Sequence, residues 1–268
     1  MGTQTLRVEK RRAAERPRDF VAARGPDAAD YLQRMLSNDV ETLAVGETCD
    51  ALLLTAKARV IAALRVLRRG KDDFLLLTEP GLGEAVLTTL ARTRFAAKVA
   101  IAAEEHRNTI VFGEAEGLPT HDYGDPAVEV LDAVVEGEPL SAEELELLRI
   151  EAGTPAWGRE IDDRILPAEA GLDGTHVSFT KGCYPGQEPI ARLRYRGHAN
   201  RQLRRLALGG PELPAADLEL RHDGKAVGRV TSAARRADGS IAALGFIRTE
   251  VALDAVLDSD LGPVRQRG

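Results

Sequence analysis

Most apolar residues of this chain fall in short runs divided by polar turns, such as Val60–Val66 and Phe74–Leu77 on either side of Arg69-Gly70-Lys71-Asp72. Runs of this length and spacing are typical of strands. No run approaches the ~20 apolar residues that a membrane-spanning helix needs. Helical spacing is confined to a few stretches, so the pattern predicts an α+β fold that is dominated by short strands.

Turn and cap residues set the expected boundaries. Gly25-Pro26-Asp27 precedes one helical stretch, Pro80-Gly81 precedes a second, and Ser141 is a strong N-cap with acidic residues in the following turn. We therefore expect helices over 28–36, 82–90 and 141–150. We expect strands over 51–54, 60–66, 74–77, 95–103, 109–112 and 128–135, and then over 203–208, 218–220, 226–231 and 241–247.

The chain divides near residue 200. Residues 113–126 and 156–200 are rich in turn formers and predict loops, whereas the short strands after Arg201 predict a small barrel or sandwich. The expected domains are residues 1–200, with two subdomains split near 50–130, and residues 201–268.

Composition excludes several classes of protein. The net charge of −6 is a poor match for a general nucleic-acid binder. The two cysteines, Cys49 and Cys183, are too few for a disulfide framework or a four-cysteine cluster. The small number of cysteines fits a reducing compartment. The segment 1–24 is rich in arginine but also contains acids and has no apolar core, so it does not resemble a signal or transit peptide. We expect a cytoplasmic protein without a membrane segment.

The segment Lys181–Glu188, of sequence Lys-Gly-Cys-Tyr-Pro-Gly-Gln-Glu, concentrates reactive groups. Gly182 allows a bend at the cysteine, and Pro185-Gly186 indicates a turn. A neighbouring lysine favours the thiolate of a cysteine, which is its nucleophilic and metal-binding form. The segment predicts a functional site, and the alternative is a surface turn with an incidental cysteine.

Several segments, read in order, carry a resemblance to a known family. They are Leu148–Gly153, Gly158–Ile161, Leu166–Leu172, Lys181–Glu188 and Gly228–Ser232. Together they resemble the YgfZ-type folate-binding proteins, which are cousins of the aminomethyltransferase (T-protein) of the glycine cleavage system. The resemblance covers nearly the whole chain, and the Lys181–Glu188 segment is specific to the YgfZ branch.

The resemblance implies a ring of three domains around a central channel that binds tetrahydrofolate or a one-carbon derivative, with the C-terminal domain a small β-barrel. It also implies a link to the assembly or repair of iron–sulfur enzymes, and hence iron–sulfur client or assembly proteins as partners. Neither implication comes from composition or periodicity.

Glu151 is the first candidate folate contact, because the matching glutamate of the transferases contacts folate and a carboxylate accepts hydrogen bonds from two neighbouring N–H groups of a pterin. Arg149 belongs to the same candidate set. The alternative is a structural ion pair of Glu151 with Arg149 or another cation. The channel wall is expected to include Val60–Leu64.

The segment Lys57–Leu64 departs from the transferases, whose matching stretch resembles Lys-Gly-Gly-Ile-Ile-Asp-Asp-Leu. Ala62 and Ala63 stand where both aspartates would be, with Ala62 aligned to the acid that faces the reacting nitrogen of folate. Alanine can neither move a proton nor stabilise a cation. The substitution argues against aminomethyl transfer and leaves open whether the protein is an enzyme.

Cys183 and Lys181 are the candidate catalytic residues, with the thiolate as nucleophile, redox group or transient cluster ligand. A single cysteine cannot hold a cluster alone, and Cys49 is expected to be a buried apolar residue. Gln187 and Glu188 are candidates to reach the folate, with a structural hydrogen-bonding role as the alternative.

An arginine stripe follows the motif with no acid between Glu188 and Glu212. Arg192 or Arg194 is expected to dock the carboxylates of a folate tail, and the others to lie on a solvated face; nucleic acid is the less favoured partner. The histidines show no ligand spacing, so no metal site is assigned. The stripe comprises Arg192, Arg194, Arg196, Arg201, Arg204 and Arg205.

The favoured function is therefore that of a tetrahydrofolate-binding accessory protein for iron–sulfur proteins. A folate-dependent one-carbon transferase, for example of aminomethyl groups, is the second candidate. A third is an interaction protein that has lost folate binding, which a channel filled by side chains would favour.

Overall fold

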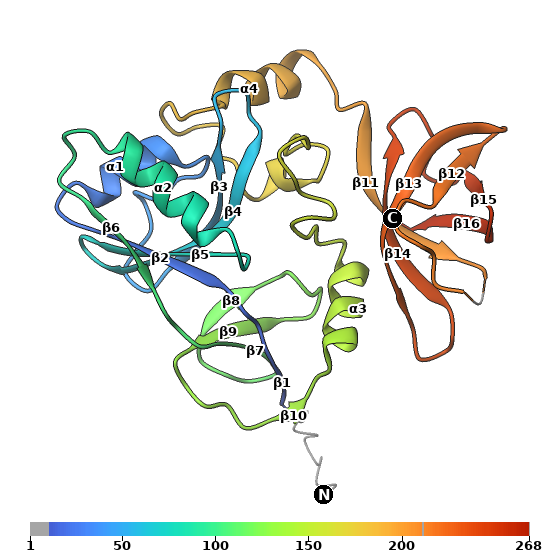
Figure 1. The fold of residues 1–268 in the computed structure, drawn as a ribbon, viewed down its shortest axis with the longest axis horizontal. Coiled ribbons are helices and arrows are strands. Elements are labelled where there is room, and N and C mark those ends of the chain that lie inside the picture. The colour runs from blue at the N-terminus through green and yellow to red at the C-terminus, as the bar shows by residue number, and fades with distance from the viewer. Residues whose placement is uncertain (1–10, 211, 268) are drawn as a thin grey trace, which may run out of the picture.

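The structure is a computed structural model that describes residues 11–210 and 212–267. It arranges them as two open sheets and a closed barrel, with helices beside them (Figure 1). The mixture confirms the predicted α+β class. The three units surround a central region to which residues 153–176 also contribute.

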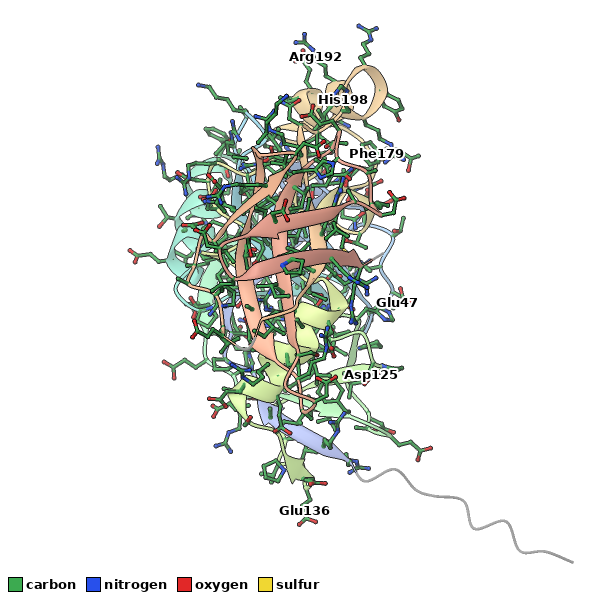
Figure 2. All side chains as sticks on the ribbon, turned by 90° about the vertical axis from the view of Figure 1, so that its right-hand side faces the viewer. Glu47, Asp125, Glu136, Phe179, Arg192 and His198 are labelled. Atoms are coloured by element: carbon green, nitrogen blue, oxygen red, sulfur yellow. The ribbon has the colours of Figure 1, made fainter. Side chains whose placement is uncertain are left out.

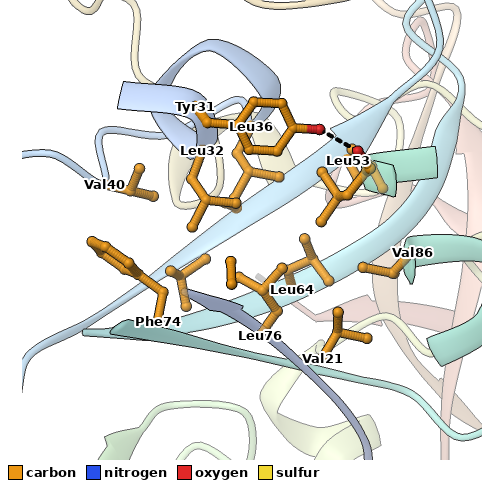
Figure 3. Close-up of a cluster of buried hydrophobic side chains, with 14 of the residues drawn as sticks. Val21, Tyr31, Leu32, Leu36, Val40, Leu53, Leu64, Phe74, Leu76 and Val86 are labelled. Carbon is orange, nitrogen blue, oxygen red and sulfur yellow. Dashed lines mark hydrogen bonds between the residues drawn. The ribbon is translucent and has the colours of Figure 1, made fainter. Parts of the chain in front are cut away.

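The first sheet has the strand order β3-β4-β5-β2-β6, and its strands pair antiparallel. Helices α1 and α2 cover one face and bury an aliphatic core, which Figure 3 shows around Leu32, Phe74 and Val86. The hydroxyl of Tyr31 donates to the carbonyl oxygen of Leu90 at 2.6 Å and ties the two helices together. The elements are β2 (Asp19–Arg24), α1 (Ala28–Met35), β3 (Thr48–Leu54), β4 (Val60–Gly70), β5 (Asp73–Thr78), α2 (Gly83–Thr93) and β6 (Ala100–Glu104).

The second sheet has the order β10-β1-β7-β9-β8. Its strand β1 comes from the start of the described chain and pairs antiparallel with β7, so the chain crosses from this sheet to the first one before α1. Strand β8 lies in the stretch that the turn formers predict as loops. The elements are β1 (Arg12–Glu15), β7 (Asn108–Phe112), β8 (Leu118–Thr120), β9 (Ala127–Leu131) and β10 (Glu138–Pro139).

Helix α3 (Ala142–Ala152) leads out of the second sheet and packs against two barrel strands, β13 (Lys225–Arg235) and β14 (Ile241–Arg248). Ser141 and Glu144 form a capping box, in which each side chain accepts the other residue's backbone N–H. The helix ends at Gly153, whose φ of 83° is left-handed. The observed helix agrees with the predicted range of 141–150 to within two residues at each end.

Residues 153–200 are mainly loops, as predicted, with a 3₁₀ turn over Leu172–Gly174. The exception is helix α4 (Gln187–Arg196), in a stretch that was expected to be loop. Of its ten residues only Ile190 is buried, so the helix lacks the repeated apolar positions by which a helix is recognised from sequence.

The C-terminal unit is a closed six-stranded barrel of order β11-β14-β13-β12-β15-β16, as the short strands predicted. Gly228 is required where β13 crosses β14, because a Cβ there would lie 2.3 Å from the carbonyl oxygen of Phe246. The strands are β11 (Arg201–Leu208), β12 (Glu219–His222), β13 (Lys225–Arg235), β14 (Ile241–Arg248), β15 (Val256–Ser259) and β16 (Gly262–Arg267).

A buried polar network joins α3 to the barrel. The fully buried carboxylate of Glu160 accepts hydrogen bonds from Arg149 Nη1 at 3.2 Å, from the Ser232 hydroxyl at 2.6 Å and from the Ala156 backbone N–H at 3.0 Å. Arg149 also donates to Ser232 at 2.8 Å. Each charge is therefore paired and hydrogen-bonded, which is the condition under which buried charges are tolerated.

We expect the substitution Glu160→Ala to lower the free energy of unfolding by about 1–3 kcal/mol, because it leaves the buried Ser232 hydroxyl and Ala156 N–H without their acceptor while Arg149 keeps Glu146 as its remaining carboxylate. Urea unfolding followed by circular dichroism measures the change. Asp163→Ala removes an exposed acid three residues away and should cost less than about 0.5 kcal/mol. Equal stabilities for the two variants would show that the network does not stabilise the contact between α3 and the barrel.

Candidate functional site

The Lys181–Glu188 motif leads into helix α4 and packs against the end of helix α1. The ammonium group of Lys181 donates to the backbone carbonyl oxygens of Gln33, Leu36 and Asn38 at 2.5, 2.7 and 2.8 Å. A cation at the C-terminus of a helix is favourable because it meets unpaired carbonyls and the negative end of the helix dipole. Burial lowers the pKa of Lys181 to about 8.

The lysine charge therefore binds the carbonyl oxygens at the end of α1. The sequence prediction, in which the neighbouring lysine favours the Cys183 thiolate, expected this charge to act on Cys183. Cys183 itself is exposed, whereas the next residue, Tyr184, is buried. Gly186 brings the motif close to the β3–β4 turn with a φ of 84°, where a Cβ would lie 2.7 Å from the carbonyl oxygen of Thr55. The motif therefore presents its thiol to solvent from a firmly packed turn.

Cys49 lies on β3 and is half-buried, packed against the core of the first sheet. Burial raises the pKa of its thiol to about 12. Cys49 is therefore less accessible than Cys183, although it is half-buried where the sequence predicted a buried residue.

A cavity of about 850 Å³ lies between the three units. Its wall includes residues of β1, β4, α3, the 153–176 loops and β11, so segments far apart in the sequence meet there. Its volume falls within the ~300–1,000 Å³ range of small-molecule sites. The charged and titratable lining residues are Glu15, Arg16, Arg18, Asp50, Arg65, Glu79, His121, Asp122, Tyr123, Glu146, Arg149 and His176.

The structure corrects the assignment of the two alanines on β4. Ala62 is fully buried in the core beneath α1 and α2, whereas Ala63 lines the cavity. The pairing register between β3 and β4 shifts near Leu53, which changes the face that each following residue occupies. The position where an acid would face a ligand is therefore that of Ala63 rather than Ala62.

An ion pair stands next to this position. Asp50 on β3 and Arg65 on β4 are register partners, and Arg65 Nε donates to Asp50 Oδ1 at 3.1 Å. Both side chains line the cavity, and only 5% of Arg65 is exposed. Each is a charged residue inside an apolar strand, which is a signal that the sequence contains; only the strand pairing shows that they meet.

Arg65 also faces the fully buried Glu129 of the second sheet at 3.5 Å, and Arg18 binds the same carboxylate. Burial opposes ionisation of Glu129, but the two guanidinium groups outweigh it and hold the pKa below its ordinary value. His176 lines the cavity from a loop, and burial lowers its pKa. A neutral imidazole can donate and accept at the same time. No sequence pattern identified this histidine.

The candidate folate contacts separate in space. Arg149 lines the cavity but is committed to its network with Glu160, and Glu151 lies outside the lining. Glu151 instead accepts from Arg236 Nε at 2.5 Å, in the alternative role of a structural ion pair, although with a cation other than Arg149. The helix period separates the two faces: Glu146, Arg149 and Ala152 lie on one face of α3, with Glu151 on another.

Arg192 projects into solvent at the end of the molecule that carries α4 (Figure 2) and does not line the cavity. Gln187 is half-buried and Glu188 exposed in the first turn of the same helix. The predicted role of these three residues in folate binding is therefore not supported by proximity to the cavity.

Among the described residues, no cluster of three or more His, Cys, Asp or Glu side chains has a geometry that could hold a metal ion. In the same part of the chain, no helix is both long enough and apolar enough to cross a membrane.

We expect Lys181→Ala to leave the reactivity of Cys183 unchanged within about twofold, because the lysine charge is held by the carbonyls of α1. The rate of iodoacetamide alkylation, measured in a Cys49→Ser background, reports this reactivity. The same variant should lose about 1–3 kcal/mol of stability through unpaired buried carbonyls. A tenfold slower alkylation with unchanged stability would instead make Lys181 an activator of the thiol.

Comparison with known proteins finds YgfZ proteins among the relatives of the chain. No family model matches the chain. It is 29% identical to the tRNA-modifying protein YgfZ of Edwardsiella ictaluri, across 87% of this chain and 83% of that protein. It is 27% identical to the tRNA-modifying protein YgfZ of Shigella dysenteriae, across 89% and 82%. An uncharacterised protein of Haemophilus influenzae is 28% identical across 80% and 81%.

A solved structure gives the fold independently. The aminomethyltransferase T of the glycine cleavage system from Bartonella henselae superposes with a TM-score of 0.85, covering 97% of this chain and 85% of that one. At 17% identity the likeness establishes the fold alone. The chain is thus similar along most of its length to YgfZ proteins, and it has the fold of the aminomethyltransferase.

Proposed function

We propose that the protein binds tetrahydrofolate or a one-carbon derivative in the 850 Å³ cavity and serves as an accessory protein for iron–sulfur proteins. The observation that carries the first half is the cavity itself. It is open, lies at the meeting point of three units and is lined by convergent polar groups, which are the properties of a ligand site. An open cavity also disfavours the reading in which side chains fill the channel.

The polar lining suits a pterin, which presents neighbouring N–H donors together with ring nitrogens and a carbonyl. Carboxylates accept paired N–H donors, and the cavity offers Asp50 and Asp122 for this purpose, whereas Glu146 is held by Arg149 and Arg159. Buried arginine and a neutral His176 supply donors for the acceptor edge. We assign the pterin contact to this set in place of Glu151.

Aminomethyl transfer is the weaker candidate. The fold favours it, but the wall carries Ala63 where β4 faces the cavity, so no carboxylate projects from that position. The nearest acid along the sheet, Asp50, is held by Arg65 at 3.1 Å. That carboxylate is already engaged by the guanidinium and does not project freely toward a ligand. The folate would thus be bound without this transfer.

The second half of the proposal rests on Cys183 and on the relatives. An exposed thiol outside the cavity lining can act as a nucleophile or a soft metal ligand toward a partner protein. The relatives are named tRNA-modifying proteins. We infer that tRNA modification is the process in which the iron–sulfur clients of this protein act.

A ring placed in the cavity should block folate. We expect Ala63→Phe to weaken tetrahydrofolate binding at least about tenfold in calorimetry, since the ring occupies volume that the ligand needs. Ala103→Phe on the exposed face of β6 is the matched control and should bind like the wild type. Glu151→Gln should also bind like the wild type, because Glu151 lies outside the lining. Tight binding to Ala63→Phe would exclude this cavity as the folate site.

Binding and function should separate at the thiol. We expect Cys183→Ser to keep folate affinity within about threefold, because a thiol outside the cavity contributes little to holding a pterin. The same variant should fail to restore iron–sulfur enzyme activity in a bacterial strain that lacks its own YgfZ-type protein. Cys49→Ser, at the half-buried and less ionisable thiol, should restore it. Full activity with Cys183→Ser would return the motif to a structural role.

A further inference from the structure

The arginine stripe divides into two groups. Arg201, Arg204 and Arg205 belong to the fold: they bind Glu169, the carbonyl oxygen of Val251, and the carbonyl oxygen of Glu151 respectively. The other three, Arg192, Arg194 and Arg196, are exposed on α4. Within residues 11–210 and 212–267, neither Arg192 nor Arg196 has a hydrogen bond or an ion pair.

Aromatic rings lie among these charges. The guanidinium of Arg194 stacks 4.0 Å from the ring centroid of Phe179, and Phe179 meets Tyr195 edge to face at 6.4 Å. The side chain of Tyr195 is 68% exposed, which is unusual for a large aromatic residue that contributes to no core. Figure 2 shows Arg192, His198 and Phe179 together at this end of the molecule.

A second cavity, of about 260 Å³, lies beside the same helix and is separate from the folate cavity in every lining residue. Its wall combines apolar side chains with the polar groups of Arg194, His198, Gln202 and Asp173. The volume lies below the ~300 Å³ at which sites for drug-sized ligands begin. It suits a single planar ring with hydrogen-bonding edges.

We propose that this face binds single-stranded RNA, and we call it the α4 surface, defined by Arg192, Arg194, Tyr195, Arg196 and the 260 Å³ cavity. Free guanidinium groups bind phosphates, an exposed aromatic ring stacks on an unpaired base, and a small polar cavity accepts one base edge. Together these are the features of a site for unpaired nucleic acid. This proposal differs from the expectation from composition that nucleic acid is the less favoured partner.

Charge distribution supports this partner. The chain has a net charge of −6, so a phosphate backbone is repelled by the rest of the molecule and attracted to this end. Glu188, in the first turn, is the one acid on α4. Asp173 is the one acid that lines the small cavity. An acidic protein segment would satisfy the arginines but would not use Tyr195 or the small cavity. The proposal is independent of folate binding.

The test uses the full chain and a fluorescein-labelled ten-nucleotide oligouridine, followed by fluorescence anisotropy across a range of salt concentrations. The Arg192→Ala/Arg196→Ala variant should bind at least tenfold more weakly at low salt. Its slope of log affinity against log salt should fall by about 1.4, at ~0.7 for each lost phosphate contact. The control, Arg92→Ala/Arg265→Ala, removes the same charge from exposed sites on α2 and β16 and should bind like the wild type.

Base recognition is tested separately. Tyr195→Ala should weaken binding about tenfold without changing the salt slope, because stacking involves no counterion release. A polyphosphate of equal charge and a double-stranded RNA of the same sequence length should both compete poorly. Equal loss in the Arg92/Arg265 control, or competition by polyphosphate as strong as that by oligouridine, would overturn the proposal. Unchanged binding in Tyr195→Ala would also overturn it, and would leave an acidic protein segment as the occupant.

Discussion

Buried arginine–carboxylate pairs at the joints between the three units are the interaction on which the rest of the structure depends. Arg65 links the first sheet to the second through Glu129, and Arg149 links α3 to the barrel through Glu160. A buried charge that loses its partner is strongly destabilising, so each pair fixes the position of one unit against the next. Apolar clusters also cross these joints, for example where Ile150 of α3 packs against Ala242 and Leu244 of the barrel, so burial and ion pairing act together there.

These joints also determine the character of the cavity. Because Arg65, Asp50 and Arg149 line it, the groups that hold the units together are the ones that a ligand would meet. A wall of paired charges keeps the cavity polar and preorganised, and it engages the Asp50 carboxylate with Arg65. The geometry therefore favours holding a polar heterocycle over transferring a group to it.

The chemistry of the protein is spread over places that do not overlap. The cavity lies at the centre, the exposed thiol of Cys183 lies on the turn that leads into α4, and the arginines of α4 project from the same end of the molecule. Gly186 allows the chain to approach the β3–β4 turn closely because it has no Cβ, and this approach holds the turn that carries Cys183 and the start of α4 in place. A partner that reaches Cys183 would therefore meet a basic and aromatic neighbourhood, whereas a small ligand would meet neither.

The sequence alone determined the α+β class, the helices that begin near Ala28 and Ser141 and the strands of the barrel, because apolar periodicity and caps are local properties. It also singled out Cys183 as the candidate reactive thiol, which the structure shows to be exposed. Only the tertiary structure decided which side chains meet. Helix α4 lacks an apolar face and gave no periodic signal, the register shift near Leu53 put Ala63 rather than Ala62 in the cavity, and the pairing of β3 with β4 joined Asp50 to Arg65. Pairing and register are long-range, since they depend on strands that the chain brings together only when it folds.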